Sequence, residues 1–230
     1  MVRVINPFLE QESAEGWTPA VNGKMPIHAW VPTRSGIADD LVGANDGTLT
    51  NGASIVSDTG AGGAAAFDLD GTNDLVDIGS GINPTAFSWS IWFFSTGGAN
   101  EGLISDAGGV GVSNVLNVRN VASPNGNLSF RLNGGSGTII GATGVNNAAW
   151  HHAVATYDGS HMRLYLDGAS NATAVSYSTA VTWSGNLVFG RYNSATQSFD
   201  GLIDDVRIWD QAIDATDVAD LYAAQRGGQA

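Results

Sequence analysis

The chain has 230 residues, of which 43% are hydrophobic, which suits one large domain or two small ones and excludes a disordered chain. The formal net charge of −13 argues against nucleic acid and anionic membranes as partners, and it disfavours acidic polysaccharides unless a cation bridges them. The chain has no cysteine, which excludes disulfide and thiol chemistry. No run approaches the roughly 20 apolar residues that cross a bilayer.

Residues 1–27 show no clear periodicity, and Pro7, Pro19 and Pro26 interrupt any long helix. Three of the four glutamates lie in this stretch, and its start lacks the charged and apolar regions of a secretory signal. We interpret residues 1–27 as an extended N-terminal arm with a short helical turn near residues 8–15. Either the arm is a loose terminus, or it docks on a neighbouring subunit in a homo-oligomer or a larger assembly.

Short strands separated by turns are expected from residue 27 onward. The chain contains 31 glycines, and they sit beside Asn, Ser, Thr and Asp, which is turn chemistry. Strand spacings of about 8–12 residues, with Asp-Gly turns between strands, predict a sandwich or jelly roll. The main strands are expected at residues 27–30, 64–68, 75–78, 87–94, 103–105, 116–118, 128–132, 150–157, 162–166, 187–191 and 199–209.

The last of these strands organises the interpretation of the rest. Side chains alternate across a strand, so Asp204 is expected to share one apolar face with Leu202, Val206 and Ile208. A carboxylate on a buried face costs several kcal/mol unless hydrogen bonds or a cation satisfy it. The expected partner region is the acidic stretch at residues 68–77.

One helix is expected near the C-terminus. Asp214 can cap it, and Asp217 follows three residues later, in a variant of the capping box. Val218, Leu221 and Tyr222 then fall on one helical face. The Gly-Gly pair that follows ends the helix.

Six stretches, taken in order, resemble the laminin G-like, concanavalin A-like jelly-roll family. They are residues 45–53, 67–78, 87–92, 150–159, 164–168 and 199–209. The resemblance covers roughly residues 28–223. It implies an all-β, two-sheet antiparallel jelly-roll sandwich with one short C-terminal helix, so residues 28–230 form a single laminin G-like domain after the arm.

The resemblance also implies a calcium ion at the rim of the sandwich, in a structural role. The positions that match the family's metal-adjacent turn and strand are Asp70, Asp74 and Asp204, with Asn73, Asp68 and Asp205 as second choices. Calcium takes six to eight oxygen ligands, and this turn does not follow the EF-hand pattern. The alternative is that Asp70 and Asn73 only build a turn and that Asp204 only accepts backbone hydrogen bonds.

Catalysis is not expected. Laminarinase-type members of the superfamily need paired glutamates on one strand, whereas Glu101 is the only glutamate outside the arm. His151 and His152 are adjacent in a strand, so they point to opposite faces and cannot hold one metal together. His152 is interpreted as a hydrogen-bonded interior histidine rather than a base.

Glycan binding requires exposed aromatic rings together with amides and carboxylates that hold hydroxyl groups. Trp183 and Tyr192 lie in expected loops and are the candidate ligand-binding residues. Ordinary packing is the alternative role for both.

Three functions remain open on these observations. The leading one is a non-catalytic surface-binding or structural module, a subunit of a larger assembly such as a virion capsid decoration or tail-associated protein. The second is a free calcium-dependent carbohydrate-binding lectin. A polysaccharide hydrolase or lyase is the third. The expected location of the protein is a virion or an extracellular surface.

Overall fold

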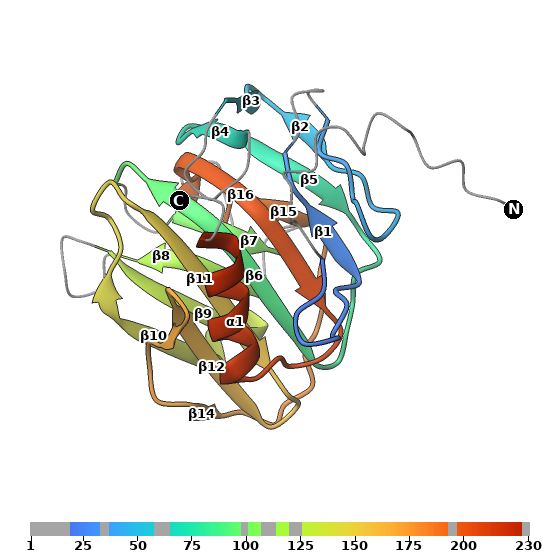
Figure 1. The fold of residues 1–230 in the computed structure, drawn as a ribbon, viewed down its shortest axis with the longest axis vertical. Coiled ribbons are helices and arrows are strands. Elements are labelled where there is room, and N and C mark those ends of the chain that lie inside the picture. Colours follow the sequence, from blue (N-terminus) through green and yellow to red (C-terminus); the bar gives the residue numbers. More distant parts are fainter. Residues whose placement is uncertain are drawn as a thin grey trace, which may run out of the picture.

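The computed structural model of the protein describes residues 19–32, 37–57, 65–97, 101–106, 114–119, 126–192 and 197–226. Two antiparallel sheets pack face to face, and one helix lies against the outer side of one of them (Figure 1). The expected all-β sandwich with one C-terminal helix is therefore confirmed. Residues 1–18, which include the helical turn expected near residues 8–15, lie outside the described residues.

The sheet on the helix side, called the front sheet, has the strand order β13-β12-β11-β6-β16-β4-β3, with β1 beside β16 and β14 beside β12. Its strands are β1 (His28–Trp30), β3 (Ser54–Val56), β4 (Ala66–Asp70), β6 (Phe87–Ser95), β11 (Trp150–Tyr157), β12 (His161–Leu166), β13 (Ala169–Ser170), β14 (Val175–Ser176) and β16 (Asp200–Trp209).

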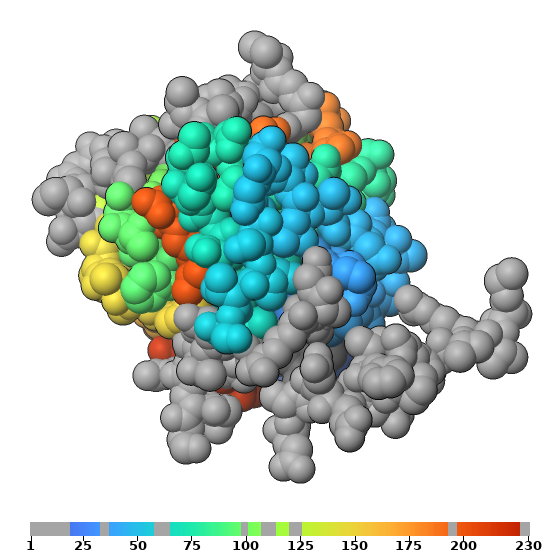
Figure 2. All heavy atoms as spheres, turned by 90° about the horizontal axis from the view of Figure 1, so that it is seen from above, coloured from blue at the N-terminus to red at the C-terminus, as the bar shows by residue number. Residues whose placement is uncertain are grey.

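The other sheet, called the back sheet, has the order β10-β9-β8-β7-β15-β5-β2. Its strands are β2 (Thr48–Thr50), β5 (Leu75–Gly79), β7 (Glu101–Ser105), β8 (Val115–Arg119), β9 (Asn127–Leu132), β10 (Gly137–Gly144) and β15 (Leu187–Phe189), with a 3₁₀ turn η1 (Asn133–Gly135) between β9 and β10. Seen from above in Figure 2, the blue to teal segments that carry β2 to β5 lie side by side at one edge of the two sheets.

The core lies between the two sheets. On β6 the alternation expected from the sequence places Phe87, Trp89, Ile91 and Phe93 toward the back sheet, all fully buried. Phe130 of β9 packs against Phe87 and Trp89, with ring centroids 6.0 and 5.9 Å apart. Burying one such side chain stabilises the fold by about 1.5–3 kcal/mol, so β6 anchors the sandwich.

The longest strand, β16, is bulged at its centre. Its register with β6 pairs Asp204 with Trp92 and Arg207 with Ser90, so two residues of β16 lie opposite one residue of β6. Asp205 has a left-handed φ of 41° at this bulge. The alternation of side chains therefore shifts by one residue across it.

The bulge corrects the face expected for Asp204. Ile203, Val206 and Ile208 all belong to the core cluster between the sheets. Asp204 is paired with Trp92, whose ring stacks under the helix, so Asp204 lies on the outer side of the front sheet. The expectation that Asp204 shares a buried face with Val206 and Ile208 is wrong, because strict alternation does not survive an inserted residue.

The helix α1 (Ala215–Arg226) begins as the sequence predicts. Asp214 Oδ1 accepts hydrogen bonds from the backbone N–H groups of Thr216 and Asp217, and Asp217 Oδ2 accepts one from the backbone N–H of Asp214. This reciprocal arrangement confirms the capping box. The Gly-Gly pair expected to end the helix lies outside the described residues.

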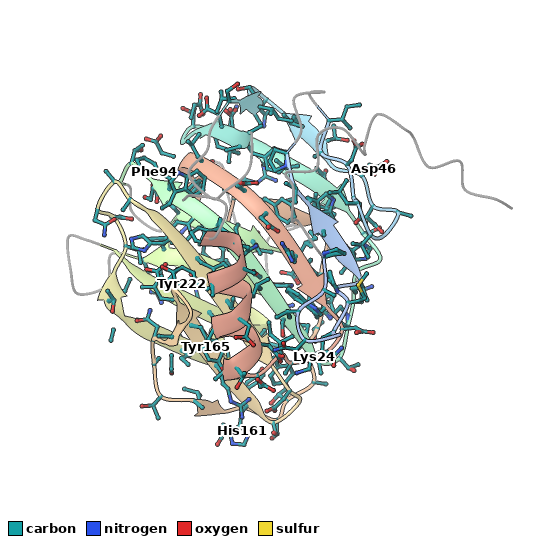
Figure 3. All side chains as sticks on the ribbon, in the orientation of Figure 1. Lys24, Asp46, Phe94, His161, Tyr165 and Tyr222 are labelled. Atoms are coloured by element: carbon teal, nitrogen blue, oxygen red, sulfur yellow. The ribbon has the colours of Figure 1, made fainter. Side chains whose placement is uncertain are left out.

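Aromatic rings fill the space between α1 and the front sheet. Tyr222 projects from α1 toward the strands beneath it (Figure 3), where His152 stacks on Trp92 at 5.1 Å and on Tyr222 at 6.0 Å. His152 Nε2 lies 2.7 Å from Ser90 Oγ. Burial lowers the pKa of His152 to about 4, so the ring is neutral near pH 7. The interpretation of His152 as an interior histidine is confirmed.

A buried ion pair lies at the bulge under α1. Arg207 donates from Nε and Nη2 to the two carboxylate oxygens of Asp205, at 2.6 and 2.7 Å. Gln225 of α1 donates a further hydrogen bond to Asp205 at 2.5 Å, and Arg207 Nη1 donates to the Pro19 carbonyl. Burial alone would raise the pKa of Asp205, but the Arg207 guanidinium holds it below its ordinary value.

Residues 19–24, assigned from the sequence to the arm, pack on the same chain. Val21 belongs to a small apolar cluster with residues of β16 and α1, including Trp209 and Leu221. Lys24 forms an ion pair with Asp217 of α1, and the Lys24 carbonyl accepts a hydrogen bond from Trp209 Nε1 at 3.1 Å. The two ends of the described chain thus hold each other against the front sheet.

The buried ion pair of Asp205 and Arg207 predicts a large loss of stability when one partner is removed. Arg207→Ala leaves the Asp205 carboxylate buried without its cation, so we expect the free energy of unfolding to fall by about 3–5 kcal/mol. The matched control is Arg163→Ala, since Arg163 pairs with Asp158 at the surface with 37% of its side chain exposed. That change should cost less than about 1 kcal/mol. Urea denaturation measures both, and equal costs would contradict the role given to Arg207.

Candidate ligand-binding face

The turn between β4 and β5 holds two of the three residues expected to bind a metal. Asp74 is 2% exposed, and its Oδ2 accepts a hydrogen bond from the backbone N–H of Asp70 at 3.2 Å. Asp74 Oδ1 is buried and has no hydrogen-bond partner. Burial raises the pKa of Asp74, and the nearby carboxylates of Asp70 and Asp68 raise it further.

The third residue, Asp204, does not join this turn. The register pairs Asp70 with Asp200, so Asp204 lies four residues further along β16, a distance of roughly 13 Å along the strand. Asp204 Oδ1 accepts a hydrogen bond from the backbone N–H of Asp205 at 2.7 Å, inside the bulge. The expectation that Asp204 reaches residues 70–74 is therefore wrong.

No group of three or more His, Asp or Glu side chains in the described part of the chain could hold a metal ion together. The residues at the turn fit a cation in one respect only, which is the unpartnered Oδ1 of Asp74. A calcium ion there would need backbone carbonyls and water for its remaining positions. Calcium binding stays a prediction.

The two aromatic residues expected to bind ligand lie in different surroundings. Trp183 is half-buried and packs against the core, with its ring 5.3 Å from that of Phe87. Its indole Nε1 donates a hydrogen bond to the Pro84 carbonyl at 3.2 Å. These contacts favour a packing role for Trp183.

Tyr192 is half-buried and lies on the outer side of the back sheet. The backbone of Arg191 and Tyr192 passes over Gly102 of β7 so closely that a Cβ at Gly102 would overlap it. Ser105 Oγ donates a hydrogen bond to the Arg191 carbonyl at 2.5 Å. Arg131 of β9 donates to the Tyr192 hydroxyl at 2.7 Å, and its Cζ lies 5.7 Å from the centre of the ring. The sheet itself therefore orients Tyr192.

Two unpartnered polar side chains lie beside this segment. The register pairs Gly102 with Asn117 and Asn117 with Ser129 across β7, β8 and β9. Neither polar atom of the Asn117 amide has a hydrogen-bond partner, nor has Ser129 Oγ, and both residues are at most 1% exposed. Their strand neighbours face the core, so Asn117 and Ser129 face outward.

We call the outer side of β7 to β10, with Arg191 and Tyr192, the back face. Its outward residues on the strands are Gly102, Ser105, Val115, Asn117, Arg119, Asn127, Ser129, Arg131, Thr138 and Ile140. Native proteins rarely leave a buried amide without partners, so the Asn117 amide is an unusual feature beneath this face.

Sequence reasoning missed Asn117, Ser129 and Arg131. The signal was present, because polar Ser129 and Arg131 alternate with apolar residues over 128–132, as does Asn117 over 116–118. What the sequence did not reveal is that the three share a face with Tyr192. That depends on the strand register and on the segment that crosses Gly102.

Glu101 lies at the same end of β7 but points inward. Its register partner is Val118, a core residue, and its Oε2 accepts a hydrogen bond from Ser95 Oγ at 2.9 Å. Glu101 is 1% exposed, and its Oε1 has no hydrogen-bond partner. Burial raises the pKa of Glu101 to about 7. Glu101 is therefore an interior carboxyl group at the start of β7.

The architecture places the chain among the lectin-type β-sandwiches. The family model of the concanavalin A-like lectin/glucanases superfamily matches residues 70–219. The chain belongs to this superfamily, as the resemblance of its sequence motifs implied. No curated protein sequence matches it.

Solved structures share the fold at low sequence identity. Domain 4 of AbnA, an extracellular arabinanase from Geobacillus stearothermophilus solved with arabinotriose, has a TM-score of 0.70 and 17% identity over 86% of this chain and 98% of that domain. The binding domain of Paraclostridial mosquitocidal protein 1 has a TM-score of 0.64 at 17% identity, over 86% of this chain. The ligand-binding domain of botulinum neurotoxin serotype D, solved with N-acetylneuraminic acid, has 0.62 at 17%, over 87%. The chain spans 51% of the length of each toxin domain.

The helix of the described chain is too short and too polar to cross a lipid bilayer.

The interior position of the Glu101 carboxyl predicts how the stability of the protein depends on pH. We expect the free energy of unfolding to fall as the pH rises from 4.5, the ordinary pKa, through about 7. The unfolded carboxyl ionises in this range while the folded one keeps its proton, so a rising pH favours the unfolded chain. At about 1.4 kcal/mol per pKa unit, the loss reaches up to about 3 kcal/mol.

The variant Glu101→Gln has no proton to lose, so its stability relative to the wild type should increase across this pH range. Asp210→Asn, at an exposed position, is the control and should leave the difference unchanged. Urea denaturation of the three proteins at several pH values measures it. A constant difference between Glu101→Gln and wild type would contradict the interior position of Glu101.

Proposed function

We propose that this chain is a non-catalytic carbohydrate-binding module and that its sugar-contacting surface is the back face around Tyr192. The observation that carries the proposal is the half-buried aromatic ring of Tyr192, which Arg131 holds on the outer side of the back sheet. Sugar sites combine an aromatic surface with a few placed polar groups that bind hydroxyls. Such a module would act at an extracellular or virion surface.

The superfamily of the chain and the solved structures of the same fold support this proposal. The superfamily to which it belongs includes lectins as well as glucanases. Two proteins of the same fold were solved with a sugar, arabinotriose in one and N-acetylneuraminic acid in the other. Their identity to this chain is 17%, so they support a sugar ligand without indicating which one.

The carboxylates of the back sheet argue against hydrolysis on this face. Retaining glycosidases need two carboxyl groups about 5–5.5 Å apart that flank the sugar. Along β7 to β10 the only acidic residue is Glu101, and it points to the interior. The strands that would present sugar to a catalytic pair therefore carry no outward carboxylate.

A calcium ion at the turn of residues 70–74 is a second part of the proposal. Asp74 Oδ1 supports it, because a buried carboxylate oxygen without a partner gains from a cation. Asp70 and Asp68 are close enough to raise the pKa of Asp74, so a cation would relieve their mutual repulsion. The role of the ion would be structural, since the turn lies between β4 and β5 and not on the back face.

Membership of a larger assembly, such as a virion, stays a prediction. It depends on the N-terminal arm, and residues 1–18 lie outside the described residues. Residues 19–24 pack on α1 and β16 of the same chain, so any contact of the arm with a neighbouring subunit would come from residues before them.

The first test of the proposed function is a glycan array probed with the intact protein, followed by calorimetry on any ligand found. Tyr192→Ala should weaken binding by about tenfold or more, because it removes the aromatic surface and the acceptor of the Arg131 hydrogen bond. The matched control is Phe94→Ala, a half-buried aromatic on the front sheet (Figure 3). Equal losses for the two variants, or no glycan bound at all, would refute the back face as the sugar site.

Calcium binding is tested by thermal unfolding with calcium and with a chelator. At a free calcium concentration of 100 times Kd, the ion should add about 2.7 kcal/mol to the stability, which raises Tm by several degrees. Asp74→Asn should abolish this shift, whereas Asp204→Asn should leave it unchanged. Loss of the shift in Asp204→Asn alone, or its absence in the wild type, would argue against calcium at this turn.

A further inference from the structure

We propose that the ligand of the back face is an acidic sugar chain whose carboxylates are bound by Arg119 at one end of the face and by Arg131 at the other. This inference rests on the proposed function and specifies the class of glycan. The observation behind it is that two arginines without a carboxylate partner flank the unpartnered Asn117 and Ser129 in a chain of net charge −13.

The charges of the chain are divided unequally between the two sheets. The strands of the back sheet carry two acidic residues, Asp77 on β5 and the inward Glu101, and two basic ones, Arg119 and Arg131. The strands β4 and β16 of the front sheet alone carry five aspartates: Asp68, Asp70, Asp200, Asp204 and Asp205. The net negative charge therefore belongs mainly to the rest of the molecule, and β8 and β9 are locally positive.

Neither arginine has a carboxylate partner in the described part of the chain. Arg131 donates hydrogen bonds to neutral oxygens only, the Tyr192 hydroxyl at 2.7 Å and the Gly134 carbonyl at 3.1 Å. The salt bridges of the described residues include neither Arg119 nor Arg131. Both side chains are half-buried, so each keeps donors for an anion that reaches the surface.

Apart from the inward Glu101, two other carboxylates belong to the back sheet or follow its strands, and both are already engaged. Asp106, beyond the end of β7, is buried and accepts hydrogen bonds from Asn114 and from the backbone N–H of Ser184. Asp77 accepts hydrogen bonds from the Asn186 amide, and β15 and β7 separate its strand from β8. Neither carboxylate neutralises the back face from within.

The strand register places Arg119 and Arg131 at opposite ends of the back face. Arg119 pairs with Asn127 at one end of the face, and Arg131 lies four residues further along β9, so the Cα atoms of the two arginines are roughly 14 Å apart. The Asn117–Ser129 pair lies between them. A sugar chain laid along this diagonal would meet a guanidinium at each end and the Tyr192 ring beside Arg131.

Arginine chemistry favours a carboxylate over a neutral hydroxyl at these two positions. A guanidinium presents parallel N–H donors that match the two oxygens of a carboxylate, and such charge-assisted hydrogen bonds are about twice as strong as neutral ones. The net charge of −13 gives long-range repulsion, but salt screens charges more than about 8–10 Å away. At contact distance the local pair of arginines therefore decides the preference.

The experiment compares acidic with neutral sugars on the intact protein by calorimetry. The probes are oligogalacturonate, which carries internal uronic acids, sialyllactose, which carries a terminal acidic sugar, and arabinotriose and lactose as neutral ligands. We expect an acidic probe to bind at least tenfold more tightly than its neutral counterpart and to weaken as salt is raised. The two acidic probes distinguish an internal from a terminal carboxylate.

Variants of Arg119 and Arg131 test whether these two residues cause the preference for acidic sugars. Arg119→Gln should reduce affinity for the acidic probe by about tenfold and leave neutral binding within about twofold. Arg131→Gln should weaken the acidic probe more than the neutral one, but both should weaken, because Arg131 also holds the Tyr192 ring. Arg131→Lys, which keeps the charge, should retain part of the preference and shows whether Arg131→Gln failed to fold. Arg163→Gln on β12 of the front sheet is the matched control and should change nothing.

Three results would overturn the inference. They are equal binding of acidic and neutral probes, an equal loss in Arg163→Gln, and an acidic preference that survives in the double variant of Arg119 and Arg131. Binding of neutral sugars alone with loss in Tyr192→Ala would leave the proposed function standing and refute only the acidic ligand. Binding of no sugar would refute both.

Discussion

The bidentate pair of Asp205 and Arg207 is the interaction on which the arrangement of the front sheet depends. It is buried beneath α1 at the bulge of β16, where Gln225 of the helix and the Pro19 carbonyl complete its hydrogen bonds. Because a buried charge without its partner is costly, the bulge, the helix and the N-terminal segment are required together. The outer side of the front sheet is thereby committed to packing.

The outer sides of the two sheets therefore differ in what covers them. The outer side of the front sheet packs under α1, where His152 contacts Ser90 and Tyr222, while no helix of the described chain covers the back sheet. Asn117 and Ser129 of the back sheet are left without partners. Tyr192 and Arg131 lie on the same side of the back sheet, which is the side that we propose as the binding surface.

The sequence predicted the elements that depend on local patterns. The strand at residues 87–94, the Asp-Gly turns between strands and the capping box at Asp214 and Asp217 all follow from neighbours in the chain. The structure confirms the strand, an Asp-Gly turn at Asp158 and the capping box. Residues that depend on long-range register were predicted less well. One inserted residue at Asp205 moved Asp204 to the other face, and no local pattern indicates such a bulge.

The candidate site illustrates the same limit. Tyr192 was identified as an aromatic residue in a loop, but its hydrogen bond to Arg131 joins residues 61 positions apart in the sequence. The outward direction of Asn117 could be inferred from alternation, whereas its lack of partners depends on everything packed around it. Chemistry that arises from such distant neighbours requires the three-dimensional structure.

The central position of β16 has a consequence for how the chain is made. β16 lies between β6 and β4, yet it is the last strand of the chain, and Lys24 meets Asp217 across 193 residues of sequence. During synthesis the front sheet therefore lacks its middle strand until residues 200–209 have left the ribosome, and β4 and β6 each present an unpaired edge until then. A nascent chain stalled before residue 200 would need a chaperone to protect those edges.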